Sequence, residues 1–193
     1  VVLAPARGLV LVAAVDRELD LPDVKKSFER YLSAVRSRQT ADGGFAMWPG
    51  ASSDLFATSY VVNLLIEAKA HQLAVPNDLL QRANGYLQTQ LAQPNTHFYL
   101  WRAQAYAAYL LTRQGVVTSA ALTNLREFIK GELSGSISDA RKSSIERDLG
   151  MVYLAASFQI LKQDSLARDL LEPALKALKS NEDPRSSWYW DYY

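Results

Sequence analysis

The chain has 193 residues, of which 49% are hydrophobic, and this is enough for one domain with a substantial core. Its 21 basic and 20 acidic residues are scattered and leave a net charge of +1, so no charge excess points to nucleic acid or to an anionic membrane. The absence of cysteine excludes a disulfide framework, a thiol nucleophile and a thiolate metal site within this chain.

Both ends of the chain are strongly apolar. It opens with "VVLAP" and closes with "WYWDYY", and ends of this kind normally pack against something. The start shows no signal-peptide pattern, and the longest nearby apolar run, Gly8–Val15, is too short to cross a bilayer. We therefore expect residues 1–193 to form a single helical domain that is a fragment of a longer protein.

Apolar residues recur at helical spacing in almost every part of the chain, and no stretch alternates convincingly with period two. Clear stripes of this spacing occur in Val24–Val35, Leu80–Leu91, Leu122–Leu133 and Ile145–Ala156. The pattern predicts an all-α chain.

Helix starts can be placed from capping residues and prolines. They fall at Pro22, at Pro76, at Thr118 or Ser119, and near Asp164. Ser143 followed by Glu146 three residues later forms a capping box and predicts a further start. Pro173 lies inside the last helix and predicts a late start or a kink there.

The helices alternate between two kinds. Residues 55–70, 98–111 and 149–161 are apolar around most of the helix circumference, whereas their partners are narrowly amphipathic and carry the charges. A helix that is apolar all round is buried on several sides, and a striped one lies outside. This alternation predicts an inner layer of helices wrapped by an outer layer, as in an α/α toroid or a helical solenoid. About eight helices are expected, so the chain supplies only part of a toroid of roughly twelve.

The stretch "RQTADGGFAMWPG", residues 38–50, interrupts this helical pattern. We interpret it as a tight turn in which Asp42 folds back on the backbone and the glycines take unusual φ angles. The aromatic residues then fill the end of the core. The alternative is that the turn forms the rim of a pocket. The predicted turn motif consists of Gln39, Asp42, Gly43, Gly44, Phe45 and Trp48.

The order of several motifs resembles a known family. "Q…DGGF…W" resembles the glutamine–tryptophan repeat of α/α toroids such as terpene cyclases, and is more similar to the thioester domain of bacterial alpha-2-macroglobulins. Val1–Leu19 resembles the segment after that family's Cys-x-Glu-Gln motif. "LFATSYVVNLLIEA" resembles its next inner helix, with Thr58 and Tyr60 matching, and "SWYWDYY" resembles the tail that returns toward neighbouring β-domains. The similarity covers essentially the whole chain.

The resemblance implies a non-enzymatic structural or interaction module of a large periplasmic, often membrane-anchored protein that traps proteases. Its partners would be target proteases, met through the longer protein, and neighbouring β-domains. The thioester Cys and Gln would lie before Val1 and are not present here. Complement relatives place a catalytic histidine where this chain has Ser53, so histidine-assisted transfer to hydroxyl acceptors is not expected. No cofactor is implied.

Other candidate sites favour structural interpretations. His71 and His97 are 26 residues apart at expected helix ends and lack acidic or histidine partners at ligand spacing, so no metal site is expected. Glu146 and Asp148 could be taken for a catalytic pair, but a capping role for Glu146 is favoured. The polar stretch 134–144 is interpreted as a surface loop.

Two alternative functions remain open. One is a terpene cyclase or prenyltransferase-like toroid enzyme, and the other is a helical-repeat protein-binding module. The enzyme would use an aromatic run on one inner helix to line its cavity, but the aspartate cluster that such enzymes need is absent from the inner helices. The aromatic run consists of Phe98, Tyr99, Trp101, Tyr106 and Tyr109. We expect most of these side chains to fill the core, with Leu64, Leu65, Tyr106, Tyr109 and Leu154 buried.

Overall fold

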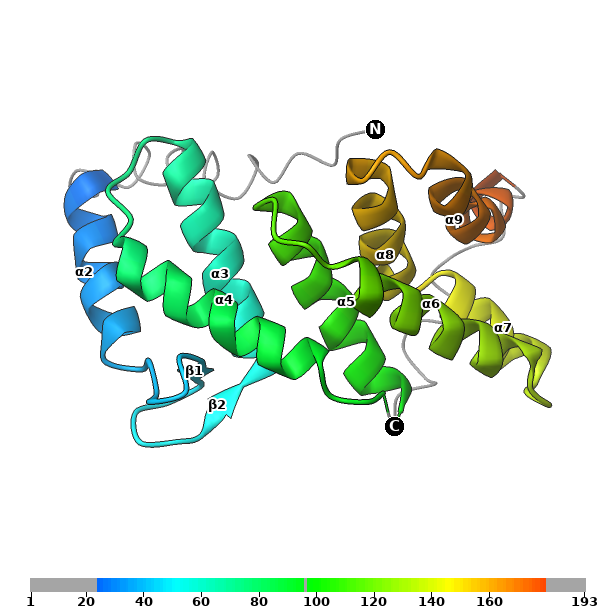
Figure 1. Cartoon of the computed structure of the whole chain (residues 1–193), viewed down its shortest axis with the longest axis horizontal. Helices are drawn as coiled ribbons and strands as arrows, with labels where there is room; N and C mark the ends of the chain where they lie inside the picture. Colours follow the sequence, from blue (N-terminus) through cyan, green and yellow to red (C-terminus); the bar gives the residue numbers. More distant parts are fainter. Residues whose placement is uncertain (1–23, 96, 180–193) are drawn as a thin grey trace. The chain divides into compact units, whose positions relative to one another are not determined.

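A computed structural model describes residues 24–95 and 97–179. These residues form eight helices and two strands of two residues each, so the all-α prediction is confirmed (Figure 1). The segments Val1–Leu19 and Ser187–Tyr193, on which two of the predicted motifs fall, lie outside the described residues. None of the described helices is both long enough and apolar enough to span a bilayer.

Contacts within the chain define two compact units, residues 1–90 and residues 91–193. The described part of unit 1 contains α2 (Val24–Arg36), β1 (Phe45–Ala46), β2 (Ser53–Asp54), α3 (Leu55–Ala70) and α4 (Asn77–Leu91). The strands pair antiparallel, Phe45 with Asp54 and Ala46 with Ser53, and so form a short hairpin between α2 and α3. The prediction of one helical domain over residues 1–193 stays a prediction.

The described part of unit 2 contains α5 (Phe98–Arg113), α6 (Ser119–Ser134), α7 (Asp139–Glu146), α8 (Leu149–Ile160) and α9 (Asp164–Lys179). α8 packs against α5 on one side and α9 on another, and α6 packs against both α5 and α8. The helices predicted to be inner, α5 and α8, therefore contact each other directly. The predicted layering is confirmed within this unit.

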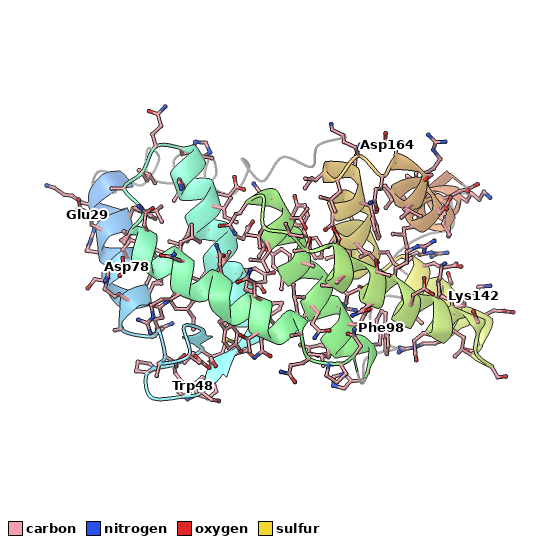
Figure 2. The ribbon with its side chains drawn as sticks, in the orientation of Figure 1. Glu29, Trp48, Asp78, Phe98, Lys142 and Asp164 are labelled. Atoms are coloured by element: carbon pink, nitrogen blue, oxygen red, sulfur yellow. The ribbon has the colours of Figure 1, made fainter. Side chains whose placement is uncertain are left out.

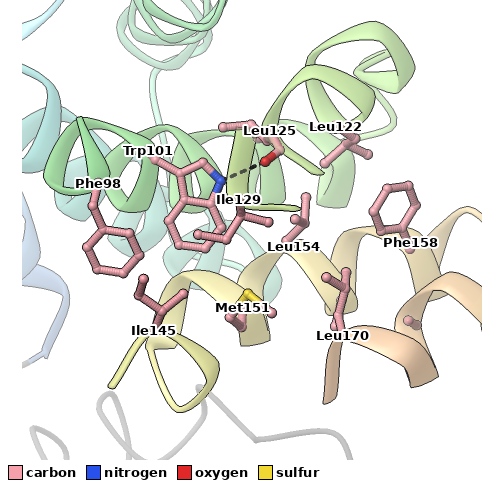
Figure 3. Packing of buried hydrophobic residues seen from close by; sticks show 13 residues of the cluster. Phe98, Trp101, Leu122, Leu125, Ile129, Ile145, Met151, Leu154, Phe158 and Leu170 are labelled. Carbon is pink, nitrogen blue, oxygen red and sulfur yellow. Dashed lines mark hydrogen bonds between the residues drawn. The ribbon is translucent and has the colours of Figure 1, made fainter. Parts of the chain in front are cut away.

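The core of unit 2 is centred on Trp101 of α5 (Figure 3). Its indole is completely buried, and its Nε1 donates a hydrogen bond of 2.8 Å to the carbonyl oxygen of Leu125 on α6. Gly150 of α8 lies directly beneath the ring, because a Cβ at this position would sit 2.9 Å from Trp101 Cη2. A glycine at the second position of α8 is thus needed for α5 and α8 to approach each other this closely.

The helix starts predicted at Pro76, at Thr118 or Ser119 and near Asp164 agree with the structure to within two residues, and the start predicted at Pro22 lies outside the described residues. Asp164 starts α9, and the helix continues through Pro173. Thr118 occupies the N-cap of α6 but makes no capping hydrogen bond, because its hydroxyl is hydrogen-bonded to that of Thr112 at 2.6 Å. His71 follows the end of α3, and His97 caps α5, with its Nδ1 accepting from the Leu100 amide at 3.2 Å.

The predicted capping box of Ser143 and Glu146 is wrong. α7 begins five residues earlier, where Ser138 accepts a hydrogen bond from the Arg141 amide at 3.2 Å, and Glu146 is its last residue. The next helix is capped instead by Asp148, which accepts from the Gly150 amide at 2.7 Å. Residues 139–144 of the polar stretch 134–144 belong to α7, so the prediction of a loop is wrong there and holds only for residues 135–138.

The burial predictions are partly confirmed. Leu65, Tyr106 and Leu154 are buried, whereas Leu64 and Tyr109 are only half-buried. Both half-buried residues lie on helices that are apolar on nearly every side. Sequence pattern alone does not show which side of such a helix is left uncovered.

Candidate functional site

The predicted turn motif forms a compact hydrogen-bonded structure between α2 and α3. The Thr40 amide donates to the Gly44 carbonyl oxygen at 2.9 Å, and the Gly43 amide donates to the Thr40 carbonyl oxygen at 3.1 Å. Gln39 is bridged to Phe45, so the chain reverses within a few residues. The structure thus brings Gln39, Asp42, Gly43, Gly44 and Phe45 together in one turn.

Asp42 is the centre of this turn. Its Oδ1 accepts from the Thr40 hydroxyl at 2.5 Å and from the Gly44 amide at 3.1 Å, and its Oδ2 accepts from the Ser53 hydroxyl at 2.6 Å. The carboxylate therefore connects the turn to β2, eleven positions further along the chain. The hydroxyl of Ser53, the position at which the family resemblance raised the question of a histidine, therefore makes a structural hydrogen bond.

The two glycines are required for different reasons. Gly43 has φ +91°, and a Cβ there would collide with the carbonyl group of Arg82 on α4. Gly44 has no positive φ, but its Cβ would lie 2.6 Å from Ser53 Cβ and 2.9 Å from the Tyr86 ring. The prediction that at least one glycine has positive φ is confirmed.

The turn is also fastened to α4. Gln39 Nε2 donates to the Gly43 carbonyl oxygen at 3.0 Å and to the Leu79 carbonyl oxygen at 3.1 Å. Arg82 Nη2 donates to the Thr40 carbonyl oxygen at 2.9 Å. Sequence reasoning missed Arg82, because it lies about 40 residues beyond the turn and no local pattern marks it.

The turn is joined to α3 through Thr58. The Phe45 amide donates to Thr58 Oγ1 at 2.8 Å, and this hydroxyl donates to the Asp54 carbonyl oxygen at 2.7 Å. Thr58 is completely buried and Phe45 is 1% exposed, so the first aromatic residue of the motif fills the core as predicted.

Trp48 does not fill the core, and this part of the prediction is wrong. Its side chain is 65% exposed, and Figure 2 shows it at the outer end of the hairpin. The reason is that the paired strands end at Ala46, and a turn follows in which the Ala51 amide donates to the Trp48 carbonyl oxygen at 3.2 Å. Trp48 therefore lies on a loop that extends past the helix ends, and Met47 beside it is 52% exposed.

The chemistry of this site is structural. All the hydrogen bonds described for Asp42 come from groups of the turn and hairpin, and neither histidine lies in this segment. Burial raises the pKa of the Tyr86 phenol, which packs beside Gly44, above its usual value. Among residues 24–95 and 97–179, no group of three His, Cys, Asp or Glu side chains is arranged to hold a metal ion.

The aromatic residues predicted on α5 differ in their surroundings. Phe98, Trp101 and Tyr106 are buried at 9%, 0% and 9% exposure, whereas Tyr99 is 66% exposed. Tyr106 and Tyr109 stack on Tyr153 of α8 at ring-centroid distances of 4.5 and 5.7 Å. These side chains fill the space between two helices, as the core-filling prediction required.

Asp148 pairs with Arg102 and not with Glu146. The Arg102 guanidinium donates Nε to Asp148 Oδ1 at 3.0 Å and Nη2 to Asp148 Oδ2, so the pair is bidentate. The same carboxylate caps α8 through Gly150. The pair thus links the amino-terminal ends of α5 and α8, which is a structural role.

No protein-family model matches the chain. Among curated proteins, it is 32% identical over 180 residues to an alpha-2-macroglobulin homolog of Yersinia pestis, a match that covers 93% of this chain. The chain belongs to the bacterial alpha-2-macroglobulin family. It spans only 8% of the length of the Yersinia relative and 9% of that of a Rickettsia conorii alpha-2-macroglobulin, to which it is 28% identical.

Solved structures agree on the fold. Native alpha-2-macroglobulin from Escherichia coli, in a structure spanning domain MG7 to the C-terminus, matches with a TM-score of 0.63 and 22% identity. The match covers 79% of this chain and 23% of that one. Trypsin-activated alpha-2-macroglobulin from the same organism matches with a TM-score of 0.59 and 22% identity, over 75% of this chain and 10% of that one. The likeness confirms the predicted fold class, an all-α chain of helix pairs of the α/α toroid type.

The hydrogen bonds of Asp42 make unit 1 sensitive to acid. Partial burial raises the pKa of this carboxyl, but hydrogen bonds from Ser53, Thr40 and the Gly44 amide outweigh it and lower the pKa below its usual value. A carboxylate whose pKa is lower in the folded chain than in the unfolded chain stabilises the fold when it is ionised. This stabilisation is complete above the unfolded-state pKa and is lost as the pH falls through the folded-state pKa. We therefore expect the Asp42 contribution to begin to fall below about pH 4, the range of an ordinary carboxyl, and to be lost as the pH falls through the lowered folded-state pKa.

Urea unfolding at pH 7 and pH 3 tests this expectation in the wild-type chain, Asp42→Asn and Ser53→Ala. Asp42→Asn should lose less stability between the two pH values than the wild type, because it has no carboxylate to protonate. The stability that Ser53→Ala loses between the two pH values should lie between those of the wild type and Asp42→Asn, because Ser53→Ala removes one of the donors to the carboxylate. An unchanged loss in Asp42→Asn would show that the carboxylate does not depend on these hydrogen bonds.

Proposed function

We propose that this chain is a non-enzymatic structural and interaction module of a larger bacterial alpha-2-macroglobulin-like protein that inhibits proteases. The observation that carries the proposal is the Asp42 turn. The Asp42 carboxylate and the Ser53 hydroxyl, which could have been catalytic groups, make hydrogen bonds that stabilise the turn and hairpin. Membership of the family supports the connection with protease inhibition, and the small share of the relatives' length supports a modular role. The target protease is bound by the longer protein, of which this chain is one part.

Exposed apolar residues of unit 1 support a role in contacting neighbouring domains. Met47 and Trp48 are 52% and 65% exposed on the hairpin, and Phe56 and Tyr60 are 48% and 57% exposed on the first turns of α3. The last two rings lie 4.6 Å apart between centroids and form one apolar surface. Exposed apolar clusters of this kind mark interaction sites, and in the longer protein neighbouring β-domains are the proposed partners.

The proposed compartment is the periplasm, and no thioester chemistry is proposed for this chain. By its family resemblance, the longer protein is periplasmic and anchored to the inner membrane. A thioester between Cys and Gln cannot form within these 193 residues, because they contain no cysteine. The module would hold such a group, where the longer protein has one, or serve as a structural interface.

Two measurements on the purified chain and on the longer protein test this function. The chain alone should neither incorporate radiolabelled methylamine, which opens thioesters, nor slow the digestion of a protein substrate by trypsin. The longer protein should slow that digestion while leaving cleavage of a small chromogenic substrate intact, as trapping requires. Covalent methylamine on the isolated chain, or trypsin inhibition by the isolated chain, would contradict the proposed division of roles.

A further inference from the structure

Sulfur occurs at two positions of the chain, Met47 and Met151, because the sequence contains two methionines and no cysteine. The two methionines differ in their access to solvent. Met47, in the loop of the β1–β2 hairpin, is 52% exposed, whereas Met151, in α8, is 3% exposed. Oxidants convert an accessible thioether to a sulfoxide, so Met47 should react with an oxidant long before Met151.

Met151 is protected by the core of unit 2. It packs in the same buried cluster as Trp101 and Leu154 (Figure 3). A sulfoxide there would bury a polar oxygen among apolar side chains, which is unfavourable. An oxidant therefore reaches Met151 only when unit 2 opens, and such openings are rare in a folded core.

Met47 lies outside the core of unit 1. The pairing of β1 with β2 ends at Ala46, one residue before it. The backbone oxygen of Met47 accepts a hydrogen bond from Arg38 Nη1 at 3.4 Å, and this contact does not involve the thioether. The buried hydrogen bond of the hairpin is made by the Phe45 amide, which donates to Thr58 Oγ1. A change at the Met47 sulfur should therefore leave unit 1 folded.

Met47 and its neighbour Trp48 give the hairpin an exposed apolar end. Trp48 is 65% exposed, and Figure 2 shows it at the outer end of the hairpin. A methionine side chain is flexible and polarisable, so it adapts to the shape of a partner surface. A sulfoxide is polar, and its oxygen costs free energy when a contact buries it without a hydrogen-bond donor. Oxidation of Met47 would thus weaken an apolar contact made by this end of the hairpin.

On the basis of the contact surface proposed for unit 1, we infer that Met47 is a reversible oxidation site that controls the binding of the hairpin to a neighbouring domain. The oxidant is hydrogen peroxide. The Met47 sulfur attacks one peroxide oxygen, so that the S–O bond forms and the O–O bond breaks, and the departing hydroxide takes the proton of the transferred oxygen and leaves as water. The thioether is oxidised and the peroxide is reduced. A methionine sulfoxide reductase restores the thioether with electrons from a thiol and releases the oxygen as water.

Peroxide treatment of the 193-residue chain tests the oxidation site itself. Peptide mass mapping should show that the sulfoxide forms at Met47 at least about tenfold faster than at Met151. The urea midpoint of unfolding should stay unchanged, because unit 1 remains folded. Met47→Leu is the matched control, since it keeps an apolar side chain and cannot accept the oxygen. Equal rates at the two methionines would overturn the proposal, and so would unfolding that accompanies oxidation of Met47 and is absent from Met47→Leu.

Hydrogen exchange of the amides of residues 47–52 in the longer protein tests the control of binding. These amides should exchange at least about tenfold more slowly in the untreated longer protein than in the isolated chain, because the neighbouring domain covers the hairpin. Peroxide should remove this protection in the wild type and leave it in Met47→Leu. A methionine sulfoxide reductase should then restore the protection in the wild type.

Two kinds of failure are distinguishable in this experiment. If the untreated longer protein shows no protection of the hairpin, the proposed contact surface is wrong, and the oxidation control is overturned with it. If protection is present but survives oxidation of Met47, or if the bound hairpin keeps Met47 from being oxidised at all, only the oxidation control is overturned. Equal loss of protection in the wild type and in Met47→Leu would also overturn it, because another residue would then be responsible for the effect.

Discussion

Trp101→Ala should lower the free energy of unfolding of unit 2 by about 3–5 kcal/mol. The indole is completely buried and is surrounded by core residues of α6 and α8, including Ile129 and Leu154. Its removal leaves a cavity and also leaves the Leu125 carbonyl oxygen without the indole donor at 2.8 Å. Urea unfolding followed by far-UV circular dichroism measures the change.

Trp48→Ala is the matched control, since it removes the same side chain from an exposed position. Trp48 is 65% exposed, so we expect a change of about 0.5 kcal/mol or less in the isolated chain. A loss comparable to that of Trp101→Ala would mean that Trp48 fills the core after all. A small loss for Trp101→Ala would instead contradict the description of the unit 2 core.

Gly43→Ala should destabilise unit 1 by about 2–4 kcal/mol, because two separate costs add. The residue has φ +91°, which a side chain at this position disfavours. Its new Cβ would also meet the Arg82 backbone, with the carbonyl carbon at 2.9 Å, so α4 would have to move away from the turn. Hydrogen exchange of the Gly44 and Ala46 amides, together with urea unfolding, measures the loss.

Gly50→Ala separates the two costs. Gly50 has a similar φ of +80°, but nothing lies within 4 Å of the position of its Cβ. Only the conformational cost should remain, about 1 kcal/mol. If Gly43→Ala were no worse than Gly50→Ala, the close packing of the turn on α4 would be refuted, whereas the positive φ alone would still explain the glycine.

The helices could be predicted from sequence because their cause is local. The apolar period of 3.6 residues and the capping and proline signals at Pro76, Thr118 and Asp164 lie within a few residues of the elements that they start. The distinction between all-round apolar and striped helices also depends only on the residues of each helix. For the same reason the turn around Asp42 was predictable as a turn, with glycine at the position of positive φ.

What could not be predicted depends on contacts between distant segments. Two groups of α4, the Arg82 guanidinium and the Leu79 carbonyl oxygen, make hydrogen bonds to the turn. No sequence pattern near Asp42 predicts these contacts. The position of Trp48 depends on where the β1–β2 pairing ends. Ser138 caps α7 and Asp148 caps α8, so the local capping signal at Ser143 did not identify either helix start.

We propose that this chain acts as a folded structural module within a longer protein that inhibits proteases. The most direct measurement is trypsin inhibition by the longer protein carrying Gly43→Ala or Gly50→Ala, assayed with a protein substrate at a temperature at which only the Gly43→Ala module is unfolded. We expect the longer protein with Gly43→Ala to lose most of the inhibition and the one with Gly50→Ala to keep it. Full inhibition by Gly43→Ala, with its module shown by hydrogen exchange to be unfolded, would contradict the claim.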